Sequence, residues 1–227
     1  MPQTNSLTRR LVAECLGSAL LLAIVVGSGI MADRLADGNT AIALLANTLA
    51  TGAGLLALIL LFGPVSGAHF NPLVTLGALW FKQLDRRMAG LMILAQICGA
   101  FAGVALAHAM FDMTLFSASH HSRTGASQWL SEAVASFGLL GVIIGCSRRQ
   151  PAATPVAVSA WIMSAYWFTA STSFANPAVT LARAASDSFA GIRPADAPGF
   201  ILAQLIGAAC SVLLFDWLFA PSPQDPP

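Results

Sequence analysis

A six-residue phrase occurs twice in this chain, and it constrains the fold more than any other feature. The phrase NPLVTL at 71–76 returns as NPAVTL at 176–181, 105 positions later. Asparagine followed by proline favours a helix start, because Asn caps the first turn and Pro fits the first helical position, where no N–H is needed. We therefore expect two short helices, about 71–81 and 176–186. Their first residues are Pro72, Leu73, Pro177 and Ala178.

The composition is typical of a protein in a lipid environment. Of the 227 residues, 56% are hydrophobic and 9% are charged, and the mean hydropathy is +0.73, whereas a soluble domain carries roughly 25% charged residues. The net charge of +1 provides no basic surface for nucleic acid. The cysteines lie inside apolar runs as small hydrophobes, so we expect no disulfide, metal site or cofactor. They are Cys15, Cys98, Cys146 and Cys210.

Six stretches are long and apolar enough for membrane-spanning helices, which need about 20 mostly apolar residues. They are 7–32, 40–63, 88–111, 128–146, 155–171 and 197–220. The first is longer than the core of a secretory signal and contains Glu14, so we interpret it as a span.

The loop charges predict a multi-pass protein with both termini in the cytoplasm. Short cytoplasmic loops carry an excess of Lys and Arg, and this orientation places seven of the 11 cationic residues on the cytoplasmic side. These seven are Arg9, Arg10, Lys82, Arg86, Arg87, Arg148 and Arg149.

The repetition extends beyond the short phrase to a unit of three spans. Residues 7–111 and 128–220 are expected to be two copies of this unit within one transmembrane domain, 1–227, that ends in a short tail, 221–227. An odd number of spans inverts the second copy in the membrane, and inverted repeats place a shared site at the midplane. The matching polar residues are Glu14 with Glu132 and Gln96 with Gln204.

Each phrase lies between the second and third spans of its copy, so one enters from the cytoplasm and the other from outside. A helix of about ten residues is about 15 Å long, half of a ~30 Å hydrocarbon core. The two helices would then meet N-terminus to N-terminus at mid-depth. Non-helical backbone is tolerated there only beside protein or a water-filled cavity. We therefore expect the loops 64–70 and 171–175 to line a pore with their carbonyl groups.

The chemistry of this meeting point favours uncharged polar solutes. The side-chain oxygens of Asn71 and Asn176 can cap their own helices, which leaves both NH₂ groups to face the pore. The two helix ends together contribute roughly +1 elementary charge near the midplane. A neutral hydroxyl-bearing solute can accept hydrogen bonds from both amides, whereas a cation meets an electrostatic barrier.

These features resemble the aquaporin, or major intrinsic protein, family over nearly all of residues 7–220. The matching elements are the run SGAHFNP at 66–72, both Asn-Pro phrases and the paired Glu and Gln residues, while Leu73 departs from the usual Ala. The resemblance implies an all-α membrane protein with six transmembrane helices and two re-entrant half-helices. It further implies a homotetramer in the lipid bilayer of a bacterial inner (plasma) membrane, a channel for water and glycerol-like solutes rather than an enzyme.

The resemblance also locates an outer selectivity filter by distance from the two Asn residues. Family members commonly have aromatic side chains and an Arg there, and in this chain the four positions carry neither. Val179 stands in place of the Arg, as in the branch associated with bacterial arsenic handling. The resemblance thus implies a widened pore that admits neutral metalloid hydroxides such as arsenous acid (arsenite). The four filter positions are Thr51, Ser164, Ser173 and Val179.

Two intramembrane carboxylates leave the mode of transport open. Glu14 and Glu132 either hold the half-helix loops in place or form a proton relay in a coupled carrier. Within the channel class, a water-dominated pore is the alternative to a broad solute channel.

A histidine and an arginine each allow two interpretations. His69, beside Phe70 in the pore-lining loop, either lines the pore or gates it by protonation. Arg183 lies one helical turn after Val179, on nearly the same face. It either supplies a charge to the outer vestibule or bonds to loop carbonyls or Asp187.

Overall fold

The computed structural model describes residues 6–220, and within this range every regular element is a helix. The expected tail, 221–227, lies outside the described residues. The helices are α1 (Leu7–Leu35), α2 (Thr40–Ser66), α3 (Pro72–Trp80), α4 (Arg86–Met110), α5 (Ala126–Arg149), α6 (Thr154–Phe168), α7 (Pro177–Arg183) and α8 (Ala197–Leu218), with a 3₁₀ turn, η1 (Pro151–Ala153), before α6.

Five of the described helices are long and apolar enough to cross a membrane: α1, α2, α4, α5 and α8. The sixth expected span corresponds to α6, which has only 15 residues. It is shorter than expected because the backbone turns to an extended conformation at Thr169 and enters the loop before α7. In the first half, α2 continues through Pro64 to Ser66, so the loop predicted at 64–70 begins only at Gly67.

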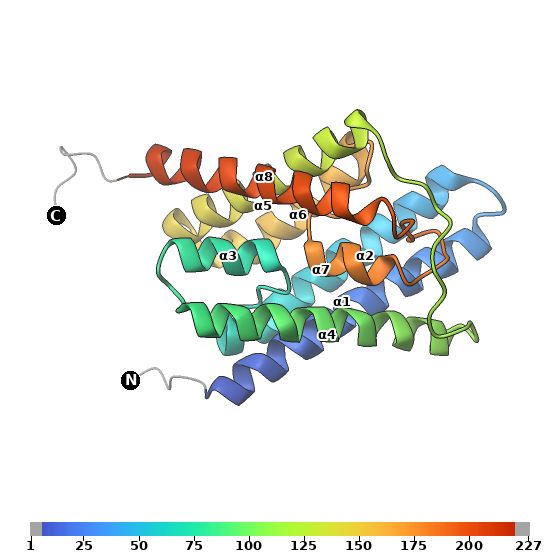
Figure 1. Ribbon diagram of the computed structural model, residues 1–227, viewed down its shortest axis with the longest axis horizontal. Coiled ribbons are helices and arrows are strands. Elements are labelled where there is room, and N and C mark those ends of the chain that lie inside the picture. Colours follow the sequence, from blue (N-terminus) through green and yellow to red (C-terminus); the bar gives the residue numbers. More distant parts are fainter. Residues whose placement is uncertain (1–5, 221–227) are drawn as a thin grey trace.

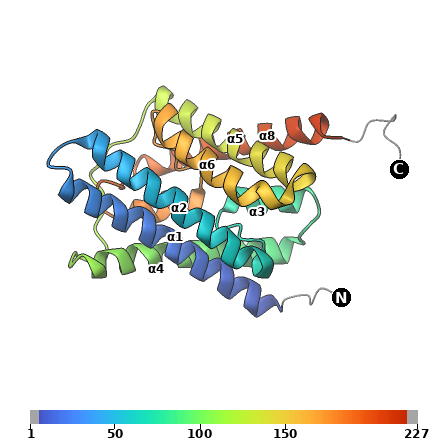
Figure 2. The same ribbon diagram turned by 180° about the vertical axis from the view of Figure 1, so that it is seen from behind.

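The two short helices lie between long helices, on the face of the bundle that is turned toward the viewer in Figure 1. Figure 1 shows α3 and α7 one after the other along the long axis, with α4 on one side and α5 and α8 on the other. Seen from behind, α1, α2 and α6 cover the opposite face (Figure 2). The start of α1 and the end of α8 lie at the same end of the bundle (Figure 1).

Both short helices begin where the repeated phrase predicts, directly after an Asn. The first matches its expected length closely, with nine residues. The second has only seven residues. Beyond Leu181, N–H groups donate to the carbonyl three residues earlier, as the Ala184 N–H does to the Leu181 carbonyl. This 3₁₀-type ending is common at helix C-termini.

Glycines allow the long helices to approach each other closely in each half. A β-carbon at Gly99 of α4 would lie 2.1 Å from the Cys15 carbonyl oxygen of α1. A β-carbon at Gly207 of α8 would lie 2.1 Å from the Ala133 carbonyl oxygen of α5. Small residues serve helix packing in membranes, because lipid provides no hydrophobic drive between helices. The pairs α1–α4 and α5–α8 are therefore held by backbone proximity.

Gly99→Ala should weaken the protein, because the new methyl group would overlap the backbone of α1, which cannot rotate away. We expect a loss of roughly 1–3 kcal/mol, as for overpacked cores, seen as a lower thermal midpoint of the purified protein in detergent. Gly90→Ala on the same helix is the control, because its β-carbon would meet nothing within 4 Å. Equal midpoints for the two variants would contradict this account of the packing.

Candidate functional site

The tips of the two short helices meet through reciprocal hydrogen bonds between asparagines and the opposite loops. The Oδ1 atom of Asn71 accepts the Leu73 N–H at 2.9 Å, and that of Asn176 accepts the Ala178 N–H at 3.0 Å. The Nδ2 of Asn71 donates to the Ala175 carbonyl and the Nδ2 of Asn176 to the Phe70 carbonyl, each at 2.8 Å.

These crossing bonds correct the expectation that both NH₂ groups are free. Each amide has two N–H donors, and one of them is engaged with the opposite half of the chain. One donor per asparagine therefore remains for a solute. The engaged donor fixes the plane of each amide, so the remaining N–H points in a defined direction.

The loops before the two asparagines have the same unusual backbone in both halves. Residues 67, 68 and 70 have positive φ angles, as do residues 172, 173 and 175, 105 positions later. All but Gly67 carry a side chain, and a left-handed conformation costs such residues roughly 1–2 kcal/mol each. The two loops therefore share one backbone conformation.

A buried carboxylate collects the N–H groups of each loop. Glu14 accepts the N–H groups of His69 at 3.0 Å and Phe70 at 2.8 Å, and Glu132 accepts those of Phe174 at 2.9 Å and Ala175 at 2.8 Å.

Glutamine amides complete the environment of both carboxylates. Gln96 donates to Glu14 at 2.7 Å and Gln204 donates to Glu132 at 2.6 Å. Both carboxylates are fully buried. Hydrogen bonds to a charged acceptor contribute about 1.5–3 kcal/mol each, so these bonds offset the strain of the left-handed residues. The Ser66 hydroxyl also donates to Glu14, at 2.6 Å. This geometry matches the scaffold interpretation, because each carboxylate is held by two backbone N–H groups and a glutamine amide.

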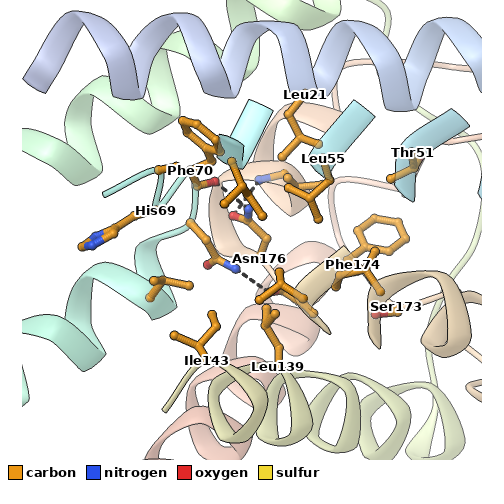
Figure 3. A pocket seen from close by; sticks show the side chains of 18 of the residues that line it. Leu21, Thr51, Leu55, His69, Phe70, Leu139, Ile143, Ser173, Phe174 and Asn176 are labelled. Atoms are coloured by element: carbon orange, nitrogen blue, oxygen red, sulfur yellow. Dashed lines mark hydrogen bonds between the residues drawn. The ribbon is translucent and has the colours of Figure 1, made fainter. Parts of the chain in front are cut away.

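A cavity of about 130 Å³ runs past the meeting point. Figure 3 shows Asn176 near its middle, with His69 toward one end and Phe174 toward the other. We call the His69 end the inner end and the Phe174 end the outer end. Apolar side chains form the remaining walls, including Leu21, Val25, Leu55, Ile59, Leu139, Ile143, Val158 and Ile162.

The inner end leads to a second, more open cavity of about 370 Å³. Gly67 and His69 contribute to the walls of both cavities, and Arg10 lines the second. The His69 ring is fixed by a contact of 3.1 Å between Nδ1 and the Thr75 hydroxyl. The His69 side chain thus stands where the central cavity opens toward the end of the bundle that holds the start of α1.

Three of the four sequence-predicted filter residues line the central cavity: Thr51, Ser173 and Val179. The fourth, Ser164, was wrongly assigned. Its side chain is exposed on the far face of α6, and its hydroxyl donates to the Ala160 carbonyl of its own helix at 2.9 Å. Positions two residues apart on a helix differ by about 200°, so Ser164 faces away from the cavity that Ile162 and Tyr166 line.

The outer end contains aromatic and cationic side chains that the filter positions did not predict. Tyr166 and Phe174 both line the cavity, and the Tyr166 hydroxyl lies 3.4 Å from that of Thr51. The spacing of four between Thr154, Val158, Ile162 and Tyr166 is the sequence signal that could have identified this face of α6.

Arg183 lies at the outer end and is 2% exposed. Its Nε donates to the Ala190 carbonyl, and its guanidinium carbon lies 3.4 Å from the centre of the Phe174 ring. Of the two partners considered from the sequence, the loop carbonyl is the one observed. Asp187 instead accepts the His120 backbone N–H at 2.9 Å.

A second arginine holds the outer loops together. Arg123 lies in the connection between α4 and α5 and donates to the carbonyls of Gly191 at 2.8 Å and Ser171 at 3.3 Å. Burial lowers the pKa of this guanidinium to about 10, while the nearby Glu132 and Tyr166 act in the opposite direction. Arg123 therefore keeps its charge at neutral pH.

Comparison with known proteins identifies a family for the chain. Residues 1–169 match the family model described as major intrinsic protein. The chain is 54% identical to the aquaglyceroporin AqpS of Rhizobium meliloti over 220 residues, covering 97% of this chain and 94% of that protein. It is 34% identical over 131 residues to the glycerol uptake facilitator protein of Escherichia coli K12, covering 56% of this chain and 44% of that protein.

The fold also matches a solved structure. The X-ray structure of the aquaglyceroporin from Plasmodium falciparum superimposes with a TM-score of 0.68 at 21% identity. The match covers 95% of this chain and 98% of that one. The all-helical fold expected from the resemblance, with two half-helices between the spans, is thus confirmed.

Glu132→Gln should destabilise the centre, because an uncharged amide oxygen replaces the carboxylate that accepts the Phe174 and Ala175 N–H groups. We expect a loss of about 1–3 kcal/mol in stability and reduced solute flux per inserted protein, measured by thermal unfolding and vesicle swelling. Asp85→Asn is the control, because Asn caps a helix as well as Asp does and Asp85 caps α4 at an exposed end. A Glu132→Gln protein as stable as the control would refute the scaffold role.

Proposed function

The chain belongs to the major intrinsic protein family, and we propose that it is a passive channel of broad size range within that family. Its solutes are small, uncharged and polar: water, glycerol-like polyols and neutral metalloid hydroxides such as arsenous acid. The glycerol uptake facilitator and aquaglyceroporin names of its relatives support this choice of solute class.

The observation that carries the proposal is the two-sided wall of the central cavity. Near the middle, one side presents the amide donors of Asn71 and Asn176, and apolar side chains such as Leu21, Leu139 and Ile143 form much of the opposite wall (Figure 3). A polyol has hydroxyl groups along a hydrocarbon backbone, so it can bond to the polar side while its C–H groups contact the apolar walls. Water fits the same polar line, and a cavity of about 130 Å³ has room for several water molecules in file.

The outer end combines small side chains with the larger Tyr166, Phe174 and Arg183. Thr51, Ser173 and Val179 present small side chains to the cavity, and the Ser173 hydroxyl has no hydrogen-bond partner among residues 6–220. An uncharged metalloid hydroxide is compact and surrounded by OH groups, so it offers this hydroxyl a partner as a polyol does.

We assign the channel to a bacterial inner (plasma) membrane as a homotetramer with both termini in the cytoplasm. The start of α1 and the end of α8 at one end of the bundle agree with this orientation. The two halves, 7–111 and 128–220, act as inverted repeats of one channel domain. The equivalent bonds of Glu14 and Glu132 support that division.

Vesicles containing the purified protein test the proposal. Water, glycerol, urea and arsenous acid are presented in turn, and the rate of volume change or uptake is followed. A broad channel passes all four without saturation. A water-dominated pore passes water alone. A coupled carrier saturates at low solute concentration and responds to an imposed proton gradient.

Val179→Arg should narrow the outer end and lower glycerol permeability by about tenfold, equivalent to about 1.4 kcal/mol in the barrier, with a smaller effect on water. Stopped-flow measurement of both solutes in vesicles gives the ratio. Ser164→Val is the control and should leave this ratio unchanged, because Ser164 faces away from the cavity. Unchanged glycerol permeability in Val179→Arg would remove Val179 from the filter.

A further inference from the structure

Two arginines lie against the same aromatic ring at the outer end. The guanidinium carbon of Arg183 is 3.4 Å from the centre of the Phe174 ring, and that of Arg123 is 5.2 Å from it. Aromatic rings attract cations through their negative faces, so Phe174 stabilises two positive charges that would otherwise repel each other. The two groups nevertheless have different surroundings.

The N–H donors of Arg123 are bonded to other groups of the protein. Its guanidinium reaches the carbonyls of Gly191, Ser171 and Phe189 and lies within 3.5 Å of the Thr172 hydroxyl. It is absent from the lining of the central cavity. Its role is to fix the loops that surround the outer end.

Arg183 keeps most of its donors unused. Among residues 6–220, the only hydrogen bond of its guanidinium is the one from Nε to the Ala190 carbonyl. A guanidinium has five N–H donors, so both terminal nitrogens remain available. Arg183 lines the central cavity, so these free N–H donors are part of the cavity wall.

Arg183 is also the only permanently charged side chain among the described residues that line the central cavity. Glu14 and Glu132 are fully buried behind the wall and do not line it. A fixed positive charge in a narrow, poorly solvated passage acts strongly on ions, because the surrounding dielectric is low. It sets no such electrostatic barrier for uncharged solutes, and its N–H groups can donate hydrogen bonds to them.

We propose that Arg183 is the residue that excludes cations, hydrated protons included, at the outer end of this pore. This assignment rests on the channel function proposed above. The first turn of α7 presents the uncharged Val179, and the charge enters one turn later, held by Phe174 and the Ala190 carbonyl. The pore thereby combines a small side chain at Val179 with an electrostatic barrier at Arg183.

The test compares proton and glycerol permeability in the same vesicles, using an internal pH-sensitive dye and a potassium diffusion potential. Wild-type protein should pass glycerol and almost no protons. Arg183→Met should raise the ratio of proton to glycerol permeability on the order of tenfold, since the barrier charge is lost. Arg183→Lys should retain the low ratio, because the charge remains.

Arg34→Met is the matched control. Arg34 also lies over a phenylalanine ring, that of Phe111 at 5.2 Å, but outside the cavity wall. The ratio of proton to glycerol permeability in Arg34→Met should therefore equal that of the wild type. A purely structural role for Arg183 would lower both permeabilities together and leave the ratio unchanged, which would overturn the proposal. So would free proton passage through the wild-type protein.

Arg183→Gln decides the matter if the methionine variant does not assemble, because its amide can still donate to the Ala190 carbonyl while the charge is gone. It should show the same rise in the ratio, and a wild-type ratio would overturn the proposal. Failure of the channel function itself would appear separately, as the absence of glycerol and urea flux in the wild type.

Discussion

The pore centre depends on two buried carboxylates that bind backbone N–H groups. Glu14 and Glu132 each accept two consecutive N–H groups from a loop whose φ angles are otherwise unfavourable. With these N–H groups bound to the carboxylates, the Phe70 and Ala175 carbonyls accept the amides of the opposite asparagines. The polar line along the pore thus follows from charges that no solute touches. A carboxylate bonded in this way serves as an anchor for its loop.

The asparagines add a second constraint, between the two halves. Each amide caps its own short helix and donates to the opposite loop, so the two tips are fixed relative to each other as well as to their helices. This arrangement uses half of the donor capacity and gives the other half a defined direction. A solute therefore meets rigid donors at the centre, and the free-energy cost of orienting them is small.

The sequence predicted the parts of this structure that depend on local chemistry. The capping of a helix by Asn-Pro depends only on residues of that helix, so α3 and α7 begin where expected. The internal repeat indicates that Glu14 and Glu132 are equivalent, and this needs no knowledge of the fold. Parts that depend on register across a loop did not follow from counting positions along the chain. Ser164 was assigned by counting back from Asn176 through a connection of unfixed length, and a shift of two residues exchanges one face of α6 for the other. Tyr166 was missed with it, although the spacing of four from Thr154 to Tyr166 marks this face of α6.

The reciprocal amide bonds also bear on how the chain is made. Asn71 and the Ala175 carbonyl are 104 residues apart in sequence, so the first half emerges from the ribosome long before its partner exists. Until then the Phe70 carbonyl and the Asn71 amide lack their final partners, which is costly where lipid replaces water. The nascent first half must therefore keep these groups hydrated or shielded by other protein. Closure of the centre is a late event in biogenesis, completed only when both halves have been inserted.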